Sequence, residues 1–165
     1  EIGGGSLVAL TRDEDPNVRA AAAETLGERP GHGAADALLA LLDDPEWFVR
    51  VHAARSAGHV VGAAGAPAIA HLLSDTRWWV RTAAKDALRA LGREAVPALV
   101  RVLGSPDRFA RNGAAEVLQD IGVVDQLAVQ DPQSQLLARI YAAGGERLRE
   151  AAELRAATRA RAEAA

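Results

Sequence analysis

The sequence predicts an all-α protein: a right-handed α-solenoid of about four to five helix pairs, followed by a C-terminal capping helix. Two observations support this prediction. Alanine supplies 38 of the 165 residues and aromatic residues only 4%, and a core of small side chains needs the close backbone approach that packed helices provide. The second observation is an internal repeat of about 31 residues, a period typical of stacked helical repeats.

The repeated segment begins with Asp or Ser and ends, six residues later, in Val-Arg or Ala-Arg. It occurs four times, with spacings of 31, 31 and 30, at residues 13–19, 44–50, 75–81 and 105–111. Apolar or small residues then follow at four and eight positions after the Val or Ala, which is the spacing of one face of an α-helix. Long helices are therefore predicted at 14–29, 45–60, 76–91 and 106–121.

The starts and ends of these helices are also signalled. Asp44 and Ser105 are expected to cap two of them, with the proline that follows each at the first helical position. Asp13 and Asp75 are expected to cap the other two without that proline. Glycine follows the last three long helices, as is common at helix C-termini. Shorter apolar helices are predicted before the long ones, at 34–42, 63–73 and 94–103.

The two ends of the chain are expected to differ from the repeats. Residues 1–6 are predicted to be a linker or a cloning remnant, and residues 7–143 the solenoid, with 123–143 as a degenerate fifth repeat that caps the stack. Residues 144–165 are predicted to form a C-terminal helix that frays at its end. Because the chain opens at Glu1 and has no methionine, we expect a piece of a longer protein, in which a membrane anchor could precede it.

Composition argues against several classes of function. The net charge of −3 disfavours a nucleic-acid partner, which usually needs a basic surface. The absence of cysteine excludes thiolate metal sites, and His52 and His59 lie two helical turns apart, too far for one metal. No apolar run is long enough to insert into a membrane. We find no motif for catalysis, so no catalytic, cofactor-binding or metal-binding residue is predicted.

The repeat resembles the HEAT-like repeats first described in phycobilisome lyases, whose hallmark is D-P-x-P-x-V-R-x-A-A-x-x-A-L-x-x-L-G. The resemblance covers residues 7–122 and implies a solenoid whose long helices line the concave face. It also implies that the Asp and Arg of each copy bond from one repeat to the next. The residues of this expected Asp–Arg ladder are Asp13, Arg19, Asp44, Arg50, Asp75, Arg81 and Arg111.

Aromatic residues are where the chain departs from this family pattern. Five of the six lie at the two positions before the Val-Arg or Ala-Arg, where the family typically has proline and a polar residue. We call these five the aromatic ladder: Trp47, Phe48, Trp78, Trp79 and Phe109. On a helical wheel neither ring of a pair points towards the core, so the ladder is expected along one edge, at the starts of the long helices. Two arrangements stay open: rings exposed for a partner, or one ring of each pair packed at the repeat junction.

Arginines accompany the aromatic ladder. Arg77 and Arg108 flank Trp78 and Phe109 in the sequence. Arginine beside an aromatic ring can hold an anionic peptide or a phosphate. The alternative is that these arginines are ordinary solvated or stack-bonded residues.

These patterns predict a non-enzymatic scaffold that binds a protein or peptide through its concave face and the aromatic ladder. The expected partner-binding residues are Trp47, Phe48, Trp78, Trp79, Phe109, Arg77 and Arg108. The family resemblance implies one alternative, a bilin lyase or chaperone-like enzyme on the same scaffold. A HEAT-like alkylpurine DNA glycosylase would use Trp78, Trp79 and Asp75, but its strongly basic surface is missing, and a mere spacer is a further alternative. We expect a cytoplasmic location, or membrane tethering in a longer protein, and predict no oligomeric state.

Overall fold

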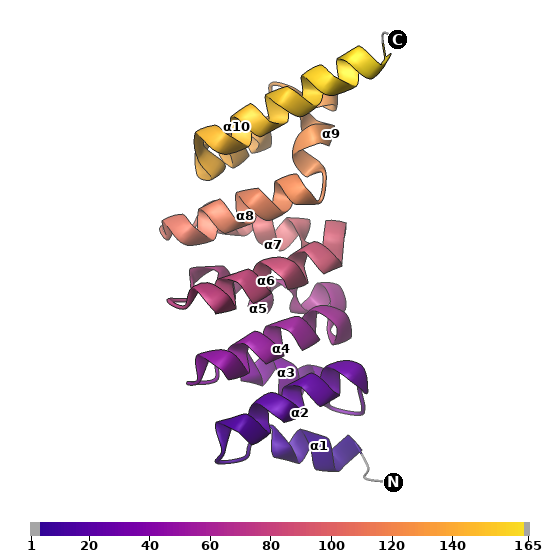
Figure 1. Cartoon of the computed structure of the whole chain (residues 1–165), viewed down its shortest axis with the longest axis vertical. Helices are drawn as coiled ribbons and strands as arrows, with labels where there is room; N and C mark the ends of the chain where they lie inside the picture. The colour runs from indigo at the N-terminus through magenta and orange to yellow at the C-terminus, as the bar shows by residue number, and fades with distance from the viewer. Residues whose placement is uncertain (1–3, 164–165) are drawn as a thin grey trace.

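The computed structural model describes residues 4–163, and within this range it consists of helices stacked in one direction, without a strand (Figure 1). Five helix pairs follow one another, in each of which a first helix leads into a second. The α-helices are α1 (Gly4–Leu10), α2 (Pro16–Glu28), α3 (Ala34–Leu41), α4 (Trp47–Val60), α5 (Ala66–His71), α6 (Trp78–Leu91), α7 (Val96–Val102), α8 (Arg108–Asp120), α9 (Val123–Gln130) and α10 (Gln135–Glu163). Short 3-10 helices extend the first helices of two pairs: η1 (Gly62–Gly65), η2 (Leu72–Ser74) and η3 (Gly92–Ala95).

The helices form two layers. The second helices of the pairs, α2, α4, α6, α8 and α10, lie in the front layer of Figure 1, and the shorter first helices lie behind them. The two ends of the chain are at opposite ends of the stack (Figure 1). Consecutive second helices pack against one another, and each first helix packs against the second helix of its own pair. The prediction of an all-α solenoid of helix pairs is therefore confirmed.

Small residues allow the second helices to approach closely. A Cβ atom added at Gly58 of α4 would lie 2.9 Å from the Cβ of Ala87 on α6, and one added at Gly27 of α2 would lie 2.8 Å from the Cβ of Ser56 on α4. These separations are too short for two carbon atoms, so the first three repeats stack on backbone-to-side-chain contacts at these positions. Larger side chains such as Leu88 fill the space between the two layers and are fully buried.

The second helices begin two residues later than predicted. Their caps are Asp15, Glu46, Arg77 and Asp107. Each predicted cap instead closes a turn with the backbone N–H two residues on, as Asp44 Oδ1 does with Glu46 at 2.9 Å. The cap prediction is therefore wrong for Asp13, Asp44, Asp75 and Ser105, because short polar side chains can close such a turn before a helix as well as cap it. The prolines behind Asp44 and Ser105 lie in these turns and outside the helices.

Glycines mark the turns out of the second helices, as the sequence predicts. Gly62, Gly92 and Gly122 have φ angles of 61°, 58° and 81°, a region that side chains with a Cβ rarely adopt. Gly145, with φ 72°, interrupts the helical run inside α10. At the other end, α1 begins at Gly4, within the segment expected to be a linker, and residues 1–3 of that segment lie outside the described residues.

Candidate partner-binding site

The Asp–Arg ladder connects the first three repeats. Arg19 Nε donates to Asp44 Oδ2 at 2.7 Å, and its Nη2 donates to Asp44 Oδ1 at 3.0 Å. Arg50 makes the same two-pronged contact with Asp75, at 2.8 and 3.1 Å. Both carboxylates are nearly buried, with side-chain exposures of 5% and 8%. Arg19 and Arg50 each therefore connect their own repeat to the loop that precedes the second helix of the next repeat.

The Arg19–Asp44 pair stays charged at neutral pH. Burial by itself would raise the pKa of Asp44, but hydrogen bonds from Arg19 and from the Glu46 N–H outweigh burial and hold this pKa below its ordinary value. The hydrogen bond to Asp44 in turn raises the pKa of Arg19. The remaining Nη1 of Arg19 donates to Asp13 O at 2.8 Å, so the guanidinium also fixes the loop of its own repeat.

The Asp–Arg ladder stops at the junction between α6 and α8, because Ser105 stands where the next aspartate is expected. Arg81 Nη1 still donates to carbonyls of its own loop, to Asp75 O at 2.7 Å and to Thr76 O at 3.2 Å. Among the described residues, no acceptor lies within hydrogen-bond distance of its Nε or Nη2. The guanidinium carbon lies instead 4.9 Å from the centre of the Phe109 ring.

Long polar side chains stand between α6 and α8, at positions where α4 has small ones. Lys85 and Arg89 of α6 occupy the positions that Ala54 and Gly58 hold in α4. Both reach across to Glu116 of α8, Lys85 Nζ at 2.9 Å and Arg89 Nη2 at 2.9 Å. Side chains of this length keep the two helices further apart than glycine and alanine do. A cavity of about 220 Å³ lies between α6 and α8 at this junction.

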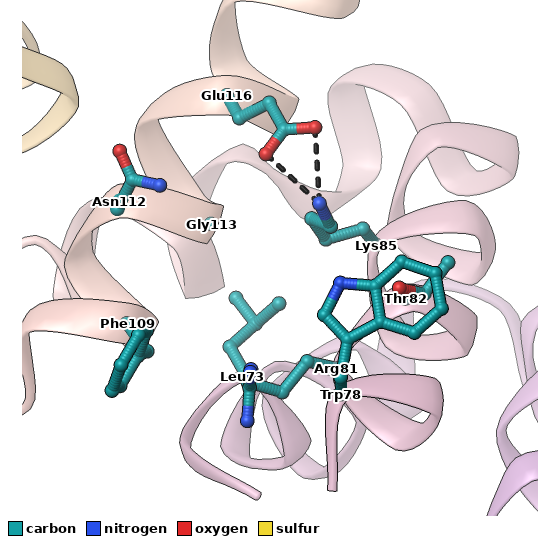
Figure 2. A pocket seen from close by; sticks show the side chains of 9 residues that line it. All are labelled: Leu73, Trp78, Arg81, Thr82, Lys85, Phe109, Asn112, Gly113 and Glu116. Carbon is teal, nitrogen blue, oxygen red and sulfur yellow. Dashed lines mark hydrogen bonds and ion pairs between the residues drawn. The ribbon is translucent and has the colours of Figure 1, made fainter.

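Figure 2 shows how the cavity is built. Trp78 of α6 and Phe109 of α8 lie on opposite sides of it, with Arg81 and Leu73 between them. The Lys85–Glu116 ion pair closes one end (Figure 2). The cavity therefore combines Leu73 and two aromatic rings with polar side chains such as Asn112 and with a guanidinium that has no carboxylate partner.

The three rings of the aromatic ladder at the starts of α6 and α8 are exposed, and two of them, Trp78 and Phe109, line the cavity. Trp78, Trp79 and Phe109 are 55%, 58% and 52% exposed. Trp47 and Phe48 are half-buried and pack against the core. The alternative in which each pair buries one ring and exposes the other therefore does not describe either pair. Trp78 borders the open junction between α6 and α8, whereas the α4–α6 junction, where the first pair lies, is tightly packed.

The edge at the starts of α6 and α8 carries positive charge. Within residues 4–163, the described contacts give no carboxylate partner to four arginines here, Arg77, Arg81, Arg108 and Arg111. Of the neighbouring carboxylates, Asp75 is paired with Arg50, whereas Asp107 caps α8 through the N–H of Ala110 at 2.9 Å and keeps its charge, so the arginines without partners outnumber it. The edge can therefore attract an acidic group although the chain as a whole has a net charge of −3.

The structure adds residues that the sequence analysis did not single out. Lys85 is the only lysine of the chain and stands where three other copies of the repeat have alanine, which was a usable signal. Its partner Glu116 lies 31 residues further along, so their contact could not be derived from local spacing. The structure also shows Thr82 Oγ1 buried beside the cavity with no hydrogen-bond partner in the described part of the chain.

Comparison with known families places the chain in a family. A family model described as HEAT repeats matches residues 6–89 and 66–157, and the chain therefore belongs to the HEAT-repeat family. Its fold is a helical scaffold of the kind these repeats build. In the part of the chain that the structure describes, no helix combines the length and the apolar character needed to cross a membrane.

Two solved structures resemble the chain. One is the complex of CpcE and CpcF of phycocyanin lyase from Nostoc sp. PCC7120, to which it is 25% identical with a TM-score of 0.59. That similarity covers 87% of this chain but only 64% of the other, so the chain spans less than two thirds of that protein's length. The other is the crystal structure of an engineered protein, 22% identical with a TM-score of 0.49, over 83% of this chain and 76% of that one. Among curated protein sequences, none matches this chain.

Proposed function

We propose that the chain is a non-enzymatic scaffold that binds a protein partner along the edge formed by the starts of α4, α6 and α8. The observation that carries this proposal is the exposure of Trp78, Trp79 and Phe109 next to arginines without carboxylate partners. Tryptophan and arginine dominate the energetic centres of protein interfaces, and clustered exposed apolar groups usually mark contact surfaces. Membership of the HEAT-repeat family and similarity to one chain of a two-protein complex support a protein as the partner.

The scaffold presents these groups on rigid elements. Trp78 and Trp79 lie on the first turn of α6 and contact each other edge to face, with ring centres 4.6 Å apart. Phe109 lies on the first turn of α8, and Val80 just behind the tryptophans is fully buried. The rings are therefore held by helices anchored in the core, so little conformational entropy is lost when a partner covers them.

The experiment is an affinity capture from a lysate of the source organism, with this chain as bait. The variant Trp78→Ala/Trp79→Ala removes the two exposed tryptophans, whereas Trp47 is unsuitable because it is half-buried against the core. Leu154→Ala is the matched control, since Leu154 is 71% exposed and lies outside the aromatic ladder. We expect a protein that the wild type and the control recover and that the double variant loses. Equal recovery by all three, with circular dichroism showing each one folded, would refute the proposed edge.

The similarity to the phycocyanin lyase complex supports a second candidate, a lyase or chaperone that handles a bilin. We assign none of the described residues of this chain to the binding or transfer of a bilin. Titration of the chain with phycocyanobilin tests it by absorbance. A saturable shift of the visible band would favour this candidate, and an unchanged spectrum would remove it.

A further inference from the structure

We propose that Arg81 binds an acidic side chain of the partner, in the place that an aspartate of the next repeat takes at the two preceding junctions. This inference rests on the proposed protein-binding function and specifies the chemistry of one contact in it. The Asp–Arg ladder itself shows what this kind of arginine binds, because the same chain repeats the arrangement with its own carboxylates.

Arg81 is held in the same way as the two arginines that do bind aspartate. In Arg19, Arg50 and Arg81, Nη1 donates to the carbonyl six residues before the arginine, at 2.8, 2.7 and 2.7 Å. In the first two, this leaves Nε and Nη2 directed at the next repeat, where both donate to one carboxylate. At Arg81 the same two donors have no acceptor among the described residues. The fork is thus preorganised for a carboxylate that this chain does not supply.

The missing group is the carboxylate alone, because the loop that should carry it keeps its shape. Ser105 Oγ accepts the N–H of Asp107 at 3.1 Å, as Asp44 Oδ1 accepts that of Glu46. Ser105 O also accepts Nη1 of Arg111 at 2.7 Å, as the carbonyls of the other loops accept their arginines. The serine hydroxyl is used within its own turn, so it leaves Nε and Nη2 of Arg81 to another group.

The neighbouring acidic side chain is not available to Arg81. Glu116 lies in the same cavity, but Lys85 Nζ donates to both of its oxygens, at 3.0 and 2.9 Å (Figure 2). Arg89 Nη2 adds a third contact to Glu116 at 2.9 Å. Arg81 therefore remains an uncompensated positive charge in a half-buried position, which favours an incoming carboxylate.

The cavity gives an incoming side chain a path and a second contact. Its volume of about 220 Å³ lies next to Arg81, between α6 and α8. Trp78 and Phe109 at its sides are both more than half exposed, so an apolar residue next to the acidic one can pack on them. These contacts fit a peptide segment that carries an Asp or Glu beside an apolar residue.

The probes are two capped tetrapeptides that differ in one group. Acetyl-Asp-Pro-Gln-Trp-amide follows residues 44–47 of this chain, with glutamine in place of Glu46 so that the aspartate carries the only charge. Acetyl-Asn-Pro-Gln-Trp-amide lacks that charge. Binding is followed through the Nε–Hε resonance of Arg81 in NMR spectra. We expect the Asp peptide to shift this resonance saturably and to bind at least about tenfold more tightly than the Asn peptide. Equal affinities, or no shift of the Arg81 resonance by the Asp peptide, would overturn the inference.

The variant Ser105→Asp gives the sharper test. The new carboxylate completes the internal ladder at Arg81, so we expect the midpoint of thermal unfolding to rise and the preference for the Asp peptide to disappear. If Ser105 acted only within its own turn, Ser105→Asp would not both raise the unfolding midpoint and abolish the preference for the Asp peptide. If the preference for the Asp peptide persists in this variant, the peptide does not use the Arg81 fork and the inference is wrong.

Two further arms locate the contact. Arg81→Lys keeps the charge but not the fork and should lose at least about tenfold in affinity for the Asp peptide. Arg111→Gln is the matched control, because Arg111 makes the same carbonyl contacts in its own loop and likewise has no carboxylate partner among the described contacts, but does not line the cavity. If the cavity and its rings select the peptide together with Arg81, this variant should leave the affinity unchanged. Inorganic phosphate is added in a separate titration. If it displaces the Asp peptide at equal concentration, the site is a general anion site, which contradicts selection of an acidic side chain.

Failure of this inference can be told apart from failure of the proposed function. A partner that is lost by Trp78→Ala/Trp79→Ala but retained by Ser105→Asp would leave the scaffold proposal standing and remove the carboxylate contact. A partner retained by both variants would remove both proposals.

Discussion

Replacing Asp44 by asparagine measures how strongly the Asp–Arg ladder stabilises the solenoid. Asparagine keeps an oxygen for the turn to the Glu46 N–H but loses the charge opposite Arg19, whose two donors lie at 2.7 and 3.0 Å. Breaking a buried ion pair costs about 3–5 kcal/mol. The side-chain exposures of 13% and 5%, and the amide oxygen that asparagine leaves to Arg19, place the expected loss of stability at or just below the lower end of this range. We expect about 2–3 kcal/mol, or a fall of about 4–12 °C in the unfolding midpoint.

Asp13→Asn is the matched control for this measurement. Asp13 Oδ1 closes the same turn, with the Asp15 N–H at 2.9 Å, but no arginine side chain donates to it among the described contacts. Its replacement should change the free energy of unfolding by less than about 0.5 kcal/mol. Both variants are compared by urea unfolding followed by circular dichroism. Equal losses, or a loss below about 1 kcal/mol at Asp44, would refute the stabilising role of the ladder.

Three further predictions follow from the packing and the charges. Because the pKa of Asp44 is lowered in the folded chain, the unfolded chain takes up this proton at a higher pH, so the contribution of Asp44 is present above about pH 4 and lost as pH falls through the folded-state pKa. Urea unfolding between about pH 7 and pH 2 should show this loss, and Asp44→Asn should reduce it. Gly58→Ala should destabilise the fold by about 1–3 kcal/mol although alanine has the better helix propensity, since the new Cβ would lie 2.9 Å from that of Ala87. Gly113→Ala is the control and should be neutral or stabilising, because the nearest atom to its new Cβ is a methyl group of Leu73 at 3.3 Å, the end of a side chain that can move. Lys85→Ala should change stability by less than about 1 kcal/mol, because its ion pair is partly exposed, and a thermal midpoint lowered by more than about 4 °C would contradict its role as a spacer.

The error in the helix caps shows where local patterns stop being sufficient. An Asp followed by Pro suits both a helix cap and a turn just before a helix. In the structure Arg50 Nη1 donates to Asp44 O at 2.7 Å and to Pro45 O at 3.1 Å, so those carbonyls belong to a loop that the arginine fixes. The helix therefore starts only at Trp47. The arginine that selects this solution lies six residues further on, outside the window of a capping motif.

The same distinction applies to the candidate site. The sequence identifies the aromatic positions and the substitution of Ser105 for aspartate, because both are departures from a repeat that occurs four times. It does not show that Trp78 and Trp79 are both exposed while Trp47 and Phe48 are half-buried. That difference depends on how closely consecutive second helices pack, which varies from one junction to the next.

The sequence by itself determined the fold class and the order of the helices in the four recurring copies of the repeat, but left the number of helix pairs at four to five. It could do so because each repeat contacts only its neighbours, so a local pattern that recurs in register specifies nearly the whole stack. Only the tertiary structure decided that the junction between α6 and α8 is open and that Arg81 faces it without a carboxylate. The physical reason is that both properties depend on residues from adjacent repeats, Lys85 with Glu116 and Arg81 with Ser105, which lie 31 and 24 positions apart in the chain.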